Sequence, residues 1–141
     1  MKYTAFFKIG VLCLALLMLN CEKDEIKVSD AEYVSGGIGT SFNTGAITID
    51  FNIPNNYAMS RVRIEFPEVN IIKEESGTGD RQVRLNHVSS GIYNYTFEFW
   101  GTENSYSTGG IEEAPLSKYF IINETVEVIN GKTLILNIYW D

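Results

Sequence analysis

The chain contains little cysteine and almost no histidine. Its two cysteines are Cys13 and Cys21, and its single histidine is His87. No cysteine follows Cys21, so the rest of the chain forms no internal disulfide and must gain its stability from packing. A zinc site needs several cysteine or histidine ligands, and the Asp-x-Asp-x-Asp-Gly spacing of a calcium loop does not occur. We therefore expect no bound metal and no cofactor.

The chain also lacks an apolar run long enough to cross a bilayer. Its longest such run covers residues 9–19 and follows Lys2 and Lys8, whereas a membrane-spanning helix needs about twenty apolar residues. A short basic start followed by a short apolar stretch is typical of a secretory signal. The sequence therefore predicts export rather than a permanent transmembrane helix.

The residues around the second cysteine resemble the lipidation signal of bacterial lipoproteins. Met18-Leu19-Asn20-Cys21 would be the lipobox, although Asn20 stands where glycine, alanine or serine is usual. The resemblance implies cleavage before Cys21 and acylation of this cysteine with fatty acids such as palmitate. An ordinary signal peptide with an incidental cysteine is the alternative.

The next charged residues, Lys23, Asp24 and Glu25, resemble the surface-export signal of Bacteroidota-type lipoproteins. This resemblance implies a protein anchored in the outer membrane that faces the cell exterior. A lipoprotein that faces the periplasm is the alternative, and a solvated tether would have the same composition. We assign residues 1–20 to the signal peptide, 21–31 to an acidic flexible tether reaching at most roughly 30 Å, and 32–141 to one domain.

Acidic residues outnumber basic ones. The chain has 11 lysines and arginines against 18 aspartates and glutamates, a net charge of −7, and loss of Lys2 and Lys8 with the signal peptide makes it −9. This charge disfavours nucleic acid and electrostatic attraction to anionic lipids. The expected partners are the membrane, through the acyl anchor alone, and an unidentified protein or glycan.

Helical periodicity is absent, and apolar residues recur with a period of two, which is typical of half-buried strands. In one segment, Tyr93, Tyr95, Phe97 and Phe99 share a face. The strands expected from this alternation cover residues 46–53, 61–66, 82–88, 92–100, 119–122, 125–129 and 133–140. We expect the last two to form a hairpin through Asn130-Gly131 that aligns Val126 with Leu136. Residues 70–80 and 101–117 show no regular pattern and are expected to be loops.

Residues 91–101 resemble a strand of transthyretin-like sandwiches, which include carboxypeptidase regulatory-like and Cna-B-type domains. The strand runs from Gly91-Ile92-Tyr93 to a second glycine, Gly101, and residues 126–134 resemble the final hairpin of these domains. The resemblance implies an all-β, antiparallel β-sandwich of about seven strands. An immunoglobulin-like topology is the alternative.

No catalytic constellation is visible. His87 follows Leu85 on the expected inward face near Ser89-Ser90, and we interpret it as a strand-end histidine that caps the core rather than as a catalytic base. Transthyretin-related hydrolases use several histidines and end in Tyr-Arg-Gly-Ser, whereas this chain ends in Tyr139-Trp140-Asp141. We therefore expect no enzymatic activity.

The candidate binding residues are Trp100 and, in the adjoining loop, Tyr106, Glu112 and Glu113. Trp100 lies opposite the aromatic row, so it is an exposed platform for a sugar or protein, part of a second core layer, or a lid under the 101–117 loop. The leading hypothesis is a non-catalytic interaction or adhesion module that binds through the loops at 69–80 and 101–117. A carbohydrate-binding accessory protein of a glycan-uptake system is the alternative, and a small hydrolase comes third.

Overall fold

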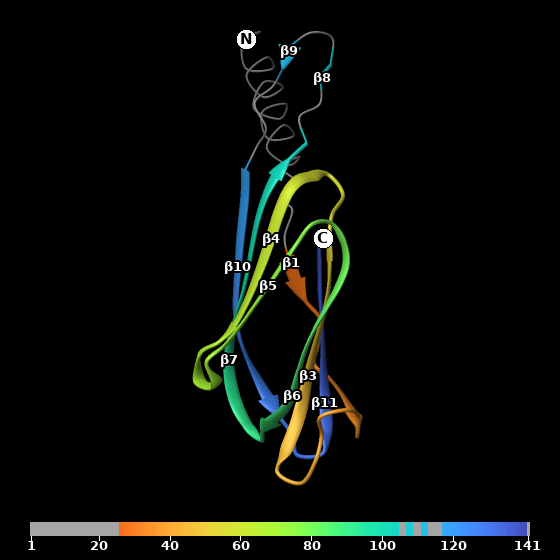
Figure 1. The fold of residues 1–141 in the computed structure, drawn as a ribbon, viewed down its shortest axis with the longest axis vertical. Helices are drawn as coiled ribbons and strands as arrows, with labels where there is room; N and C mark the ends of the chain where they lie inside the picture. The colour runs from red at the N-terminus through yellow and green to blue at the C-terminus, as the bar shows by residue number, and fades with distance from the viewer. Residues whose placement is uncertain (1–25, 105–106, 109–110, 113–116, 141) are drawn as a thin grey trace, which may run out of the picture.

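The computed structural model describes residues 26–104, 107–108, 111–112 and 117–140. They form an all-β sandwich in which two sheets enclose one hydrophobic core (Figure 1). One sheet has five strands: β1 (Ile26–Val28), β2 (Glu32–Ser35), β3 (Thr44–Ile53), β6 (Gly79–Ser89) and β11 (Lys132–Trp140). The other has four: β4 (Tyr57–Phe66), β5 (Ile71–Ser76), β7 (Gly91–Glu103) and β10 (Ser117–Val128).

Three short elements of the described residues lie outside these two sheets. A 3-10 turn, η2 (Pro67–Val69), joins β4 to β5, and β8 (Ser107–Thr108) pairs with β9 (Ile111–Glu112) beyond the end of β7. No helix in the described part of the chain is long and apolar enough to cross a membrane.

Sequence alternation decides which side chains enter the core. Phe51 from one sheet meets Phe97 from the other with ring centroids 5.5 Å apart, and Phe99 meets Trp140 at 4.7 Å. The expected aromatic row is buried throughout: Tyr93, Tyr95, Phe97 and Phe99. Each such ring typically buries 150–250 Å², so packing can stabilise a domain that has no disulfide.

The sheet order separates the two expected topologies. The sheets run β1-β11-β3-β6 and β10-β7-β4-β5, and every strand pair in them is antiparallel except β3 with β11, which is parallel. In an immunoglobulin sandwich the first and last strands lie in opposite sheets, whereas β1 and β11 are neighbours in one sheet. The immunoglobulin-like alternative is therefore wrong, and the transthyretin-like alternative remains.

The expected hairpin through Asn130-Gly131 is also wrong, because β10 and β11 lie in opposite sheets. The turn does close, with the Lys132 N–H donating to the Ile129 carbonyl at 3.1 Å. However, the Gly131 N–H also donates to the carbonyl of Thr44 at 3.0 Å. This bond joins the turn to the start of β3, so the chain continues beside β3 rather than back along β10.

The expected loop over residues 70–80 is instead the hairpin of β5 and β6. β5 pairs with β4 from Ile71 to Ser76 and forms the edge of its sheet. Ile72, Lys73 and Glu74 are all exposed, so this strand has no buried face to impose alternation. The 69–80 part of the expected binding surface is therefore regular strand and turn.

The strands expected at 119–122 and 125–129 are one strand, β10, which pairs with β7 without interruption. Their expected separation at Asn123 is wrong because the polar side chains there find partners across the ladder. The Thr96 hydroxyl bonds to the Asn123 amide oxygen at 2.9 Å, and that of Thr125 bonds to Asn94 at 3.1 Å. These cross-strand pairs replace the apolar contacts that the sequence pattern lacks.

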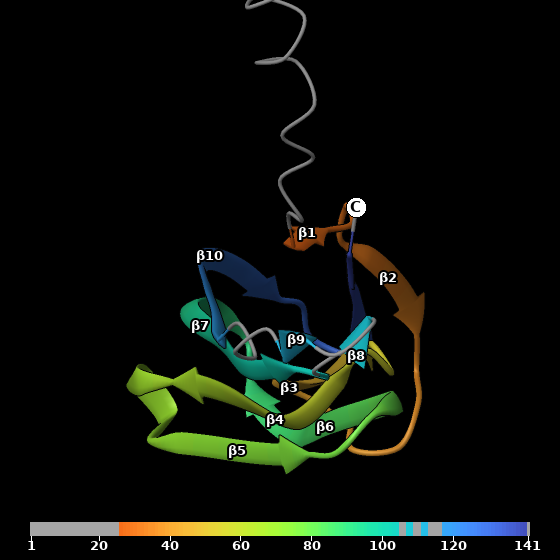
Figure 2. The ribbon, with the colours of Figure 1, turned by 90° about the horizontal axis from the view of Figure 1, so that it is seen from above.

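The first strand begins inside the segment expected to be a tether. β1 pairs with the end of β11, so that Ile26 lies opposite Trp140 and Val28 opposite Ile138 (Figure 2). Both β1 side chains are half-buried against the core. A flexible tether is therefore wrong for residues 26–28.

Candidate functional site

Trp100 lies on the outer face of the four-stranded sheet. It points away from the core row on β7, and 37% of its surface is exposed. Phe99 and Gly101, its neighbours in the chain, are buried. The alternative that placed Trp100 in a second core layer is therefore wrong, and its indole is open to a partner.

Two further side chains form a row with this indole across three strands. Tyr119 on β10 and Arg61 on β4 lie directly opposite Trp100 in the ladder. The centroids of Trp100 and Tyr119 are 5.5 Å apart with their planes tilted by 40°, and the Arg61 guanidinium carbon lies 5.9 Å from the indole centroid. We call this row the Trp100–Tyr119 face.

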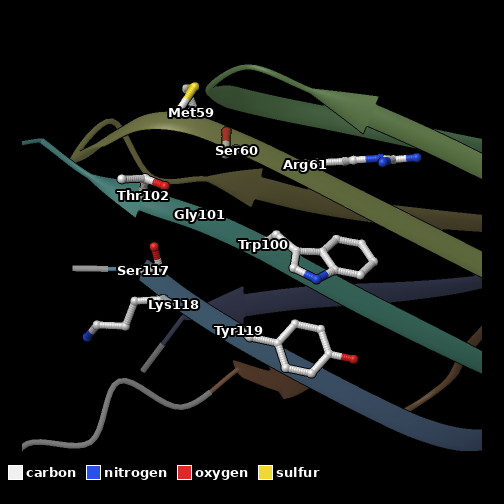
Figure 3. A pocket seen from close by; sticks show the side chains of 9 residues that line it. All are labelled: Met59, Ser60, Arg61, Trp100, Gly101, Thr102, Ser117, Lys118 and Tyr119. Carbon is white, nitrogen blue, oxygen red and sulfur yellow. The ribbon is translucent and has the colours of Figure 1, made fainter. Parts of the chain in front are cut away.

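The row borders a shallow hollow of about 350 Å³ (Figure 3). In the close-up, the Trp100 and Tyr119 rings lie side by side and extend in the same direction along their strands. Met59, 71% exposed, lies at one end of the hollow, and Thr102 and Ser117 add hydroxyl groups. The hollow thus combines ring surfaces with small hydrogen-bonding groups, a combination typical of ligand sites.

The charges beside the hollow are matched by opposite charges. Arg61 forms an ion pair with Glu74 on β5, and the Lys118 ammonium lies 3.3 Å from the Glu103 carboxylate. Because each cation already has an acid beside it, the face carries no strong excess of either sign. Such a surface suits an uncharged ligand that stacks on rings and exchanges hydrogen bonds with hydroxyl groups.

His87 does not occupy the inward face that the sequence predicted. Its backbone has a left-handed φ of 57°, and the pairing of β3 with β6 shifts at this point, leaving Asn86 and His87 opposite Ala46 alone. This bulge reverses the alternation, so His87 is exposed and Val88 is buried. The described residues contain no group of three or more histidines, cysteines or acids that could hold a metal ion.

Several predicted residues lie outside the described part of the chain: Cys21, Lys23, Asp24, Glu25, Tyr106 and Glu113. Glu112 belongs to β9, which pairs with β8. Sequence reasoning missed Tyr119 and Arg61 as partners of Trp100. Side-chain alternation along each strand shows that both residues face outward. Their positions opposite Trp100 depend on how β7 is aligned with β10 and β4, and alternation does not determine that register.

Comparison of the chain with protein-family models, with curated proteins and with solved structures finds no match. The class of protein is therefore defined by fold and surface alone, as an all-β sandwich with an aromatic face on one sheet.

Proposed function

We propose that this protein is a lipid-anchored, non-catalytic binding module of the cell envelope that takes a glycan on its Trp100–Tyr119 face. The observation that carries the proposal is the row of Trp100, Tyr119 and Arg61 across three strands on the outer face of the sheet. Exposed aromatic rings seldom gather on a soluble domain without a partner. The apolar C–H face of a pyranose ring stacks on such rings, while its hydroxyl groups bond to Thr102 and Ser117.

A glycan is favoured over a protein partner by the shape and charge of the site. The hollow is shallow and has charge-balanced walls, whereas protein hot spots sit in fully desolvated pockets and pair with hot spots on the partner. The site therefore supports the glycan-binding alternative within the broader expectation of an interaction module. The binding experiment with glycans tests this proposal against the alternative of a protein partner.

Replacing Trp100 by alanine is expected to weaken glycan binding about 10- to 100-fold, because removal of a central aromatic anchor typically costs 2 kcal/mol or more. Tyr119→Ala should weaken it less, since the phenol is the smaller ring. Calorimetric titration with the ligands identified on a glycan array measures both effects.

Ile92→Ala is the matched control. Ile92 lies on the same strand as Trp100, faces outward as Trp100 does, and is 72% exposed. Its replacement by alanine should leave glycan binding unchanged. Equal affinities of the wild type, Trp100→Ala and Ile92→Ala would contradict the proposed face. An array without any bound glycan would contradict the ligand class.

The envelope location has its own test. Cys21→Ser is expected to abolish incorporation of a clickable fatty acid and to release the protein from the membrane fraction, because the thiol is the acylation site. Cys13→Ser is the control and should retain the label. Labelling that survives Cys21→Ser would contradict the anchor, and protease resistance on intact cells would contradict outward display.

A further inference from the structure

The two long sides of the sandwich are closed differently. On one side the β5–β6 hairpin connects the sheets. On the other, β10 ends one sheet while the short β1 and β2 flank the other (Figure 2). Two hollows of about 480 Å³ each lie between β10 and β1–β2, and both are lined by Val28 and Glu124. We call this continuous depression the edge groove.

The strand that borders the edge groove has no described strand on its outer side, where the Tyr33 hydroxyl donates to the Glu127 carbonyl at 2.8 Å. Among the described strands β10 pairs only with β7, and in an antiparallel ladder every second residue directs its N–H and C=O away from the partner strand. The segment from Tyr119 to Ile122 carries no charge and no proline, the features that usually protect a strand edge. From Tyr119 to Ile122, β10 therefore presents a template for a further strand, and Glu124 and Glu127 make the rest of its edge acidic.

A buried hydroxyl at the groove lacks a partner. Tyr95 is 2% exposed and lines the edge groove beside Glu124 and Leu136. Its hydroxyl oxygen is buried and makes no hydrogen bond to any described residue. Buried polar groups are nearly always hydrogen-bonded, so this hydroxyl points to an occupant of the groove that supplies an oxygen or nitrogen atom.

The groove is acidic around this hydroxyl. Asp30, Glu124 and Glu127 line the same hollow, and none of its described lining residues is basic, whereas Lys27 lines the adjoining hollow of the groove. Three carboxylates against the one ammonium group of Lys27 leave the described lining of the edge groove net negative. The charge therefore selects a cationic occupant.

We infer that the edge groove binds an extended peptide segment with basic side chains, which adds as a strand to β10 and accepts a hydrogen bond from Tyr95. The free backbone edge favours a peptide over a small polyamine, because only a peptide repeats donors and acceptors at strand spacing. The negative charge of this chain disfavours a second copy as the occupant. The inference does not depend on the Trp100–Tyr119 face.

The test uses a fluorescein-labelled dodecapeptide of alternating lysine and threonine, measured by fluorescence anisotropy. Two further versions carry backbone N-methyl groups on the lysines or on the threonines. Strand addition predicts that one methylated version loses binding at least tenfold and the other keeps it, because only alternate N–H groups face β10. Amide exchange of β10 should slow when the unmethylated peptide binds.

Variants locate the site. Glu124→Gln with Glu127→Gln, and separately Tyr95→Phe, should each weaken the peptide at least tenfold, whereas Glu75→Gln on the far side of the sandwich should not. Equal binding of spermine, or of both methylated peptides, would identify charge attraction alone and overturn the inference. Absence of binding by the unmethylated peptide would overturn it as well, whatever the glycan result.

Discussion

Tyr95→Phe is expected to stabilise the free domain by about 1–3 kcal/mol at neutral pH. The substitution keeps the ring, which stacks on Phe66 with centroids 5.7 Å apart, and removes a buried hydroxyl that has no partner among the described residues. Leaving such a group unsatisfied costs about that amount. Urea denaturation at pH 7 measures the change, and a loss of stability would show that the hydroxyl has a partner in solution.

The same residue should make the domain sensitive to alkali. Burial, and then the Glu124 carboxylate, raise the pKa of Tyr95 from 10.0 to about 12. Below pH 10 the folded and unfolded states both keep the proton, so the stability is unaffected. Between pH 10 and 12 the unfolded state loses it first, and stability falls by about 3 kcal/mol in total.

Tyr95→Phe should abolish this part of the alkaline loss, whereas Tyr119→Phe, at an exposed phenol, should retain it. Denaturation curves at intervals from pH 9 to 12 separate the two variants. Identical pH dependence of both would mean that Tyr95 titrates like an exposed tyrosine.

Gly45→Ala is expected to destabilise the domain by about 3 kcal/mol or more. A Cβ atom at this position would lie 2.7 Å from the carbonyl oxygen of Ile129 and 2.8 Å from that of Lys132. These oxygens belong to the turn that carries the chain from β10 to β11, and backbone atoms cannot rotate away as a side chain can. Overpacking of this kind typically costs 1–3 kcal/mol, and more where the neighbours cannot yield.

Gly131→Ala in the same turn provides the contrast. Gly131 has a φ of 70° and no atom within 4 Å of the added Cβ, so only the left-handed backbone is penalised, by about 1 kcal/mol. Guanidinium denaturation of both variants measures the difference. A Gly45→Ala domain as stable as the Gly131→Ala domain would show that the turn moves aside at little cost.

The parts of the fold that follow from side-chain alternation could be predicted from the sequence. β3 and β7 bury the faces that their residues indicate, because one side of each strand meets the core along its whole length. β5 could not be predicted, since Lys73 and Glu74 are exposed at a sheet edge. The inward position assigned to His87 was wrong because a one-residue bulge reverses alternation without any mark in the pattern.

Relations between distant segments were harder to predict than the strands themselves. Val126 and Leu136 are both buried, so a hairpin and a crossing between sheets satisfy the same hydrophobic pattern. The turn bond between Gly131 and Thr44 decides between them, and it joins residues far apart in the chain. The outward position of Trp100 was predictable from parity, whereas its neighbours Tyr119 and Arg61 required the register.

Because Ile26 pairs with Trp140, the folded domain begins at residue 26. This shortens the linker that would join the domain to a membrane anchor at Cys21. Only residues 22–25 separate Cys21 from β1, so the proposed acyl group on that cysteine would hold the first strand within roughly 20 Å of the lipid surface. Trp140 also contacts Phe99, the neighbour of Trp100 in the chain. Under the proposed anchoring at Cys21, the aromatic face would lie near the membrane-proximal end of the sandwich, within reach of a polymer or protein lying along the cell surface.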